Sequence, residues 1–292
     1  MTGARIRVSL GLRLHRATAF VRARLSPDGA YGLHLTIGAV VLTGAAWLFG
    51  GIAEDLITRD PLVEVDAMIS EWLRVHASPR FAALMHAVSA LASTPAVTLL
   101  AIVLGCALLW QRRWYWLLGV VLAVPGGVLL NFVLKQVFGR ARPGWADASM
   151  ALDDPGFPSG HTMMVTIIYG LLAVYLMPAI AAWRWRFVVA ALAAAIILAV
   201  ALSRVVLGAH YLSDVLGAMA AGFARVAGVA MAAGVGYTVF SEWLNTAVRG
   251  SWAYADAMPI VPWLGIGLAP LLQWIVVPCV AFWLVRRQFG TA

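Results

Sequence analysis

The sequence contains seven apolar runs, each long enough to cross a lipid bilayer, and these runs restrict the fold more than any other feature. A membrane-spanning helix needs about 20 mostly apolar residues, and a barrel strand needs only about half that number. Each run must satisfy its own backbone hydrogen bonds within hydrocarbon, which only a helix can do. We therefore predict an all-α fold, a polytopic transmembrane helix bundle. The candidate spans are 31–53, 86–110, 114–134, 162–182, 187–207, 212–238 and 260–285.

The composition excludes a water-soluble protein. Hydrophobic residues make up 62% of the 292 residues and charged residues only 12%, whereas a soluble domain carries about 25% charged residues. The net charge of +8 does not indicate nucleic-acid binding, because the arginines lie mainly at the ends of apolar runs. That distribution is typical of membrane proteins that keep their basic loops in the cytoplasm.

The positions of the arginines predict how the protein is oriented in the membrane. Arginines occur in the arm 1–30, at 112–113 and at 184–186, which lie on one side of the membrane if every run crosses. The positive-inside rule places that side in the cytoplasm. The acidic loop 54–80 and the polar stretches 135–161 and 204–213 then meet on the extracytoplasmic side.

We divide the chain into a basic cytoplasmic arm (1–30), a transmembrane core (31–240) and a C-terminal extension (241–292). The apolar segment of the extension is rich in prolines, which kink or break helices. It forms either a seventh span or a re-entrant hairpin. Arg225 lies inside the sixth apolar run and has no obvious acidic partner in the sequence.

Three polar stretches on the predicted outer face contain charged residues or a histidine beside hydrocarbon, where such residues are costly and by default mark a functional site. They are KQVFGRARP, PSGHT and SRVVLGAHYLSD. Lys135, the only lysine of the chain, and Arg142 and Arg204 form a predicted cationic clamp for phosphate oxygens. We expect Ser159 and Gly160 to offer backbone N–H groups to the same anion at a helix start.

Two histidines complete the predicted site. His210 and Asp214 are four residues apart, so on a helix they share a face, and the carboxylate can orient the imidazole. His161 is a second titratable group, able to protonate a leaving oxygen. We interpret Asp153 and Asp154 as solvated loop residues, and these stretches contain no carboxylate cluster suited to Mg²⁺.

The order K-x6-RP, PSGH and SR-x5-H-x3-D, complete in residues 135–214, resembles the signature of the type 2 phosphatidic acid phosphatase family, which is related to vanadium-dependent haloperoxidases. The resemblance implies a six-helix core and a phosphohistidine intermediate formed without a metal or other cofactor. It implies that His210 is the nucleophile, Asp214 its orienter and His161 the acid and then the base. The implied phosphate-binding residues are Lys135, Arg142, Ser159, Gly160 and Arg204.

The leading functional hypothesis is an integral membrane phosphatase that hydrolyses a lipid phosphate or diphosphate at the extracytoplasmic face. The alternatives are a lipid phosphotransferase that uses the same intermediate and a non-enzymatic lipid-phosphate carrier. The predicted partner is the membrane lipid substrate, and no nucleic acid is expected. The sequence does not specify the lipid or the oligomeric state.

Overall fold

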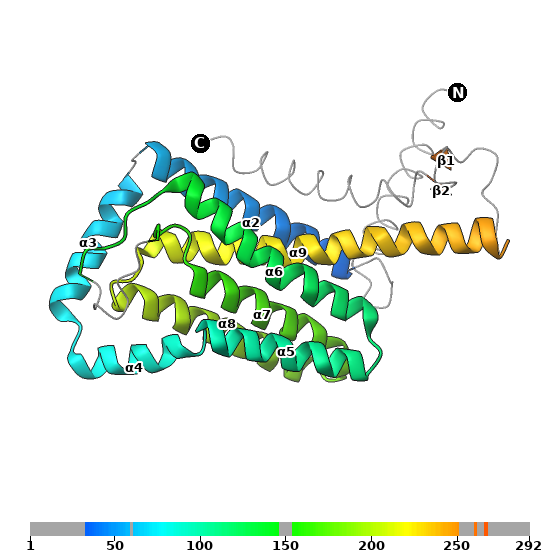
Figure 1. Ribbon diagram of the computed structural model, residues 1–292, viewed down its shortest axis with the longest axis horizontal. Helices are drawn as coiled ribbons and strands as arrows, with labels where there is room; N and C mark the ends of the chain where they lie inside the picture. The colour runs from blue at the N-terminus through cyan, green and yellow to red at the C-terminus, as the bar shows by residue number, and fades with distance from the viewer. Residues whose placement is uncertain (1–32, 59–60, 146–153, 251–259, 262–265, 268–292) are drawn as a thin grey trace, which may run out of the picture. The chain divides into compact units, whose positions relative to one another are not determined.

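The computed structural model describes residues 33–58, 61–145, 154–250, 260–261 and 266–267 (Figure 1). The chain divides into two compact units, Gly44–Ala233 and Met1–Thr43 together with Gly234–Ala292. Every candidate site residue belongs to the first unit. The described part of the second unit includes a π-helical turn, Leu244–Val248, and a pair of short antiparallel strands, β1 (Ile260–Val261) and β2 (Ile266–Gly267).

Helices dominate the described residues, and the predicted helical membrane fold is confirmed. The helices are α2 (Leu33–Thr58), α3 (Pro61–His76), α4 (Pro79–Ala90), α5 (Thr94–Trp110), α6 (Trp114–Phe138), α7 (Gly160–Leu176), α8 (Trp183–Val206) and α9 (Leu212–Trp243), with a 3-10 turn at Met177–Ala179. Among the described residues, six segments are long and apolar enough to cross a membrane. They correspond to the first six predicted runs. The arm 1–30 and most of the seventh run lie outside the described residues.

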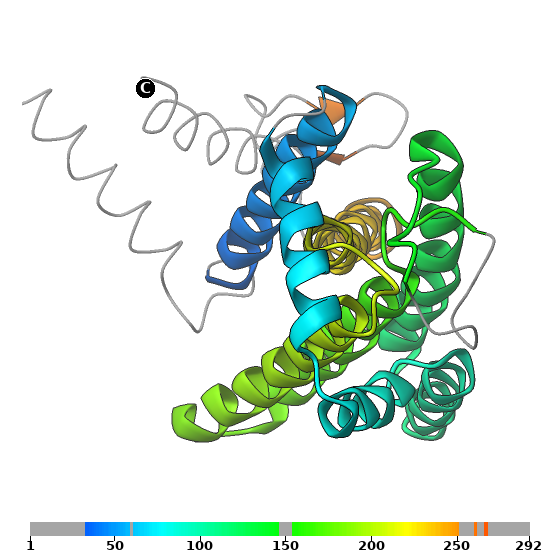
Figure 2. The same cartoon turned by 90° about the vertical axis from the view of Figure 1, so that its left-hand side faces the viewer.

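Segment 54–80, expected to be a loop, is largely helical. Helix α2 continues to Thr58, and α3 and α4 follow in close succession. Ser78 caps α4, because its hydroxyl accepts a hydrogen bond from the Phe81 N–H at 3.3 Å. Figures 1 and 2 show α3 lying across one end of the bundle. The acidic residues of this segment are therefore not all in water: Asp66 is only 1% exposed.

The core centres on α7, which packs against α5, α6 and α8. Apolar side chains of α7, such as Met163 and Ile167, are fully buried in a cluster with residues of α5, α6 and α9. The approach of α9 requires a glycine, since a Cβ at Gly222 would lie 2.8 Å from the Thr166 side chain and 3.2 Å from the Met163 carbonyl oxygen. Small residues allow close helix packing of this kind within membranes.

Arg225 of α9 finds a backbone partner rather than an acidic one. Its Nη2 donates to the carbonyl oxygen of Leu122 in α6 at 2.6 Å. Pro125 lies inside α6 next to this turn, where it has no N–H to donate and disturbs the helical hydrogen bonding. A polar contact of this kind lowers the cost of placing a guanidinium within an apolar segment.

The directions of the helices bring the three polar stretches to one end of the bundle. Helix α6 ends within the first stretch, α7 starts within the second, and the third contains the turn between α8 and α9. The arginine-rich turns at 112–113 and 184–186 precede α6 and occupy the start of α8. They therefore lie at the opposite ends of these helices.

Candidate active site

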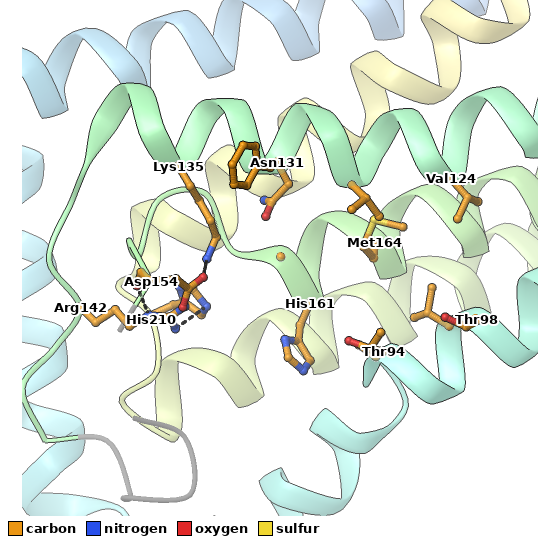
Figure 3. Close-up of a pocket in the computed structure, with 15 residues that line it drawn as sticks. Thr94, Thr98, Val124, Asn131, Lys135, Arg142, Asp154, His161, Met164 and His210 are labelled. Carbon is orange, nitrogen blue, oxygen red and sulfur yellow. Dashed lines mark hydrogen bonds and ion pairs between the residues drawn. The ribbon is translucent and has the colours of Figure 1, made fainter. Parts of the chain in front are cut away.

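A cavity of about 400 Å³ lies where the polar stretches meet. Its polar end is lined by Lys135, Arg142, Asp154, Gly160, His161 and His210, and its apolar walls include Val97, Val124, Val128, Phe132 and Met164. Figure 3 shows Lys135, Arg142, Asp154 and His210 close together, with His161 between that cluster and Thr94 of α5. The structure thus brings Lys135, Arg142 and both histidines to one cavity.

The end of α6 places Lys135. Gly139, with φ of 54°, ends the helix in the left-handed conformation, and its N–H donates to the Lys135 carbonyl oxygen at 3.0 Å. Glycine adopts this conformation at little cost. Asn131, one turn earlier on the same helix face, donates through Nδ2 to the Pro158 carbonyl oxygen at 3.1 Å. Helix α6 therefore positions both the lysine and the loop that precedes α7.

At the start of α7, Ser159 does not offer its backbone N–H to the cavity, contrary to our expectation. Its hydroxyl caps the helix by accepting from the Thr162 N–H, and its own N–H donates to the Asp214 carbonyl oxygen at 3.1 Å. The side chain is fully buried. Both groups of Ser159 thus have protein partners, whereas Gly160, the first residue of α7, lines the cavity.

The turn between α8 and α9 places His210. Gly208 has φ of 68°, and a Cβ there would meet the Trp145 ring at 2.7 Å. The turn is closed by the Arg204 carbonyl oxygen, which accepts from the N–H groups of Ala209 and His210. The Arg204 side chain is 2% exposed and donates to the Ser89 hydroxyl at 2.8 Å. Arg204 is near the site but does not line the cavity.

The ring of His210 has a defined tautomer. Nδ1 lies 2.8 Å from the Gly156 carbonyl oxygen, which can only accept, so Nδ1 carries the proton. Nε2 lies 3.2 Å from Nη1 of Arg142, which can only donate, so Nε2 presents a lone pair. Asp214 Oδ2 is 3.6 Å from Nδ1, too far for a hydrogen bond. The carbonyl of Gly156 rather than Asp214 therefore supplies the direct hydrogen bond.

Two cations of the predicted clamp, Lys135 and Arg142, hold the carboxylate of Asp154, whose side chain is 45% exposed, as expected of a solvated loop residue. One carboxylate oxygen pairs with Lys135 Nζ, and the other lies 2.7 Å from Nη2 of Arg142. Burial raises the pKa of Asp154, but the two cations outweigh it and hold that pKa below its ordinary value. Lys135 and Arg142 thus already share a two-oxygen anion, as a phosphate group would require. Asp153 lies outside the described residues.

We predict that Asp154→Asn tightens the binding of inorganic phosphate about tenfold, equivalent to about 1.4 kcal/mol. The amide occupies the same space but no longer neutralises the two cations. Thermal unfolding in detergent at increasing phosphate concentration measures the affinity, because a ligand that binds the folded state raises the midpoint. Glu64→Gln, which changes an exposed carboxylate of α3, is the control. An unchanged affinity in Asp154→Asn would contradict the prediction.

Burial lowers the pKa of His210 to about 4, although Asp214 opposes this shift. The unfolded chain, with an ordinary histidine pKa of about 6.5, then binds the proton first as the pH falls. His210 therefore costs no stability above pH 6.5, and its cost grows to about 3 kcal/mol as the pH falls towards 4.

The expected result is that the wild type loses more stability than His210→Gln between pH 7 and pH 4.5. Unfolding midpoints in detergent at the two pH values provide the measurement. Other titrating groups contribute to both proteins and cancel in the comparison. Equal losses in the two proteins would show that the histidine is not buried in its neutral form.

Several contributors to the site were not predicted from the sequence. They are Asp66, Ser70, Asn131, Arg140, Asp154, Gly156 and Ser213. A polar residue in an apolar helix one turn from Lys135 was the available signal for Asn131. In the parts of the chain that the structure describes, no three His, Cys, Asp or Glu side chains are grouped to hold a metal ion.

The fold and site together define a multi-pass membrane protein with a cationic pocket that contains two histidines at one end of its helices. Residues 114–234 match the family model described as "PAP2 superfamily". This match confirms the resemblance that the three motifs show. All eight predicted site residues lie within the matched region.

Two comparisons with individual proteins agree with the family-model match. Phosphatidylglycerophosphatase B of Bacillus subtilis (strain 168) is 28% identical over 179 residues, which cover 60% of this chain and 87% of that protein. A crystal structure described as the first transmembrane PAP2 type phosphatidylglycerolphosphate phosphatase from Bacillus subtilis superposes with a TM-score of 0.57 at 26% identity. The superposition covers 64% of this chain and 94% of the other.

Proposed function

We propose that this protein is an integral membrane phosphatase that hydrolyses a lipid phosphate or diphosphate. The observation that carries the proposal is the cavity itself, in which Lys135, Arg142 and His210 lie at one end and apolar side chains of α5, α6 and α7 line the rest. A phosphorylated headgroup fits the first part and a hydrocarbon chain the second. The similarity to a phosphatidylglycerophosphatase supports the same substrate class.

The proposed reaction starts with attack of His210 Nε2 on phosphorus. A P–N bond forms and the P–O bond to the lipid breaks, while His161 gives its proton to the leaving oxygen. His161 then accepts a proton from water, which attacks phosphorus and releases phosphate from the ring. Lys135, Arg142 and the start of α7 at Gly160 stabilise the charge on the transferring group, and Arg204, which does not line the cavity, adds positive charge nearby. Asp214 supports the imidazole ring.

We further propose that the site faces the extracytoplasmic side, with residues 31–240 as the catalytic core between the cytoplasmic arm 1–30 and the extension 241–292. The support is the position of Arg112 and Arg113 at the end of α6 remote from the cavity. Labelling of a cysteine introduced at Gly144 by a membrane-impermeant reagent in intact cells tests the orientation. Protection of this cysteine until the cells are lysed would reverse it.

The function is tested by phosphate release from a panel of lipids in detergent, with and without a metal chelator. The panel contains phosphatidic acid, phosphatidylglycerol phosphate and isoprenoid diphosphates, and His210→Ala serves as the blank. We expect release from at least one lipid that the blank does not show. Labelled phosphate in a lipid product instead of free phosphate would assign a phosphotransferase, and binding without turnover of any lipid would assign a carrier.

A further inference from the structure

A buried cluster of charged and polar side chains lies next to His210 and joins α3 to the start of α9. It consists of Asp66, Arg140, Ser213 and Asp214, of which the two aspartate side chains are inaccessible and the arginine side chain is 14% exposed. Asp66, Arg140 and Ser213 do not line the cavity. Any effect they have on a bound substrate must therefore pass through a neighbouring residue.

Arg140 links the two carboxylates. Its Nη1 donates to Asp214 Oδ1 at 2.7 Å, and its Nη2 donates to Asp66 Oδ2 at 2.7 Å. The guanidinium carbon also lies 4.5 Å from the centre of the Tyr211 ring, within the range of a cation–π contact. These contacts hold the planar guanidinium of Arg140 from several sides. The second carboxylate oxygen of Asp214, Oδ2, accepts a hydrogen bond from the Tyr211 N–H at 2.9 Å.

Asp66 binds the first turn of α9 from a different helix. Its Oδ1 accepts from the Ser213 N–H at 2.9 Å, and its Oδ2 accepts from the Ser213 hydroxyl. A carboxylate at this position satisfies a free N–H of a helix start and interacts favourably with the helix dipole. One turn further along α3, the Ser70 hydroxyl accepts from Trp145 Nε1 at 2.8 Å. The polar face of α3 is therefore hydrogen-bonded both to the first turn of α9 and to Trp145, which packs against the turn before His210.

We propose that Asp66 and Arg140 are positioning residues that keep Asp214 charged and directed at His210, so that α3 is part of the active site. This inference rests on the proposed function. Two buried carboxylates without Arg140 would repel each other, and one would take up a proton or turn away. Asp66 lies outside the region 114–234 that matches the family model, and Arg140 is not one of the residues that define the three motifs.

The expected effect is on turnover rather than on substrate binding. Arg140→Gln and Asp66→Asn should each lower kcat about 10- to 100-fold, by analogy with the loss found when a hydrogen-bond partner of a metal ligand is removed in a metalloenzyme. KM should stay within about twofold, because neither side chain lines the cavity. The matched controls are Glu71→Gln and Arg74→Gln, which break an exposed ion pair on the same helix and should leave kcat unchanged.

The same two substitutions made in the Asp214→Asn variant distinguish a positioning role from a general structural role. If Arg140 and Asp66 act through Asp214, their substitutions cause no further loss of kcat in Asp214→Asn, whereas a general structural role gives additive losses. Should Arg140→Gln not fold, Arg140→Lys, which keeps the charge but not the fork between two carboxylates, provides the comparison. Unchanged kcat in a folded variant, or additive losses, would overturn the inference. A wild type inactive on every lipid would instead overturn the proposed function.

Discussion

Replacing His210 with glutamine is expected to lower phosphate release at least about 10³-fold, the scale on which loss of a nucleophile acts. Glutamine can still donate to the Gly156 carbonyl oxygen but has no ring nitrogen to attack phosphorus. Its folded state can be checked by thermal unfolding, which separates loss of chemistry from loss of structure. His76→Ala, on the exposed end of α3, is the control and should retain full activity.

A second readout for His210 does not depend on turnover. Brief reaction of the wild type with labelled substrate, followed by alkaline quenching, should leave label on the protein that acid removes, as expected for phosphohistidine. Folded His210→Gln should retain none. More than about a tenth of wild-type activity in this variant, or equal labelling, would exclude His210 as the nucleophile.

Replacing Arg142 with glutamine is expected to lower kcat about 10²- to 10³-fold, as removal of one transition-state hydrogen-bond donor does in other enzymes. Arg142 lies 3.2 Å from His210 Nε2 and pairs with the Asp154 carboxylate, so its guanidinium is beside the proposed point of attack. Arg142→Lys should recover part of the rate, because it keeps the charge but not the planar fork. The measurement is kcat on the best lipid of the panel.

The control for Arg142 is Arg113→Gln, an exposed arginine in the turn before α6. It makes the same change in charge at the end of α6 remote from the cavity and should leave kcat unchanged. Arg142 also donates to the Ala209 carbonyl oxygen at 3.0 Å, so unfolding midpoints must accompany the rates. A folded Arg142→Gln protein with normal kcat would remove the residue from the proposed mechanism.

The membrane helices and the meeting of the three motifs could be predicted from the sequence because both depend on local patterns. A run of apolar residues specifies a spanning helix by its length, and the number of crossings then decides which loops share an end. The alternation of helix directions was enough to place Lys135, His161 and His210 at the same end of the bundle, whereas their meeting in one cavity depends on how the helices pack.

The surroundings of the site were less predictable. Asp66 resembles the other acidic residues of its segment, and its bond to Ser213 joins residues 147 positions apart. Helix α3 also exposes apolar side chains such as Met68 and Trp72 while burying Asp66 and Ser70, the reverse of the pattern that identifies a helix in a soluble protein. The Gly156 carbonyl gives no signal, because every residue carries such a group.

Helix α6 carries Asn131 and Lys135 four residues apart, with Pro125 about 15 Å below the lysine along the axis. A bend at the proline would move the Asn131 amide and the Lys135 ammonium together, because both follow it on the same helix, and the amide is hydrogen-bonded to the Pro158 carbonyl oxygen. A change in bilayer thickness would then act first on the part of α6 that precedes Pro125. Spacing between the lysine and the first turn of α7 would be preserved in membranes of different composition.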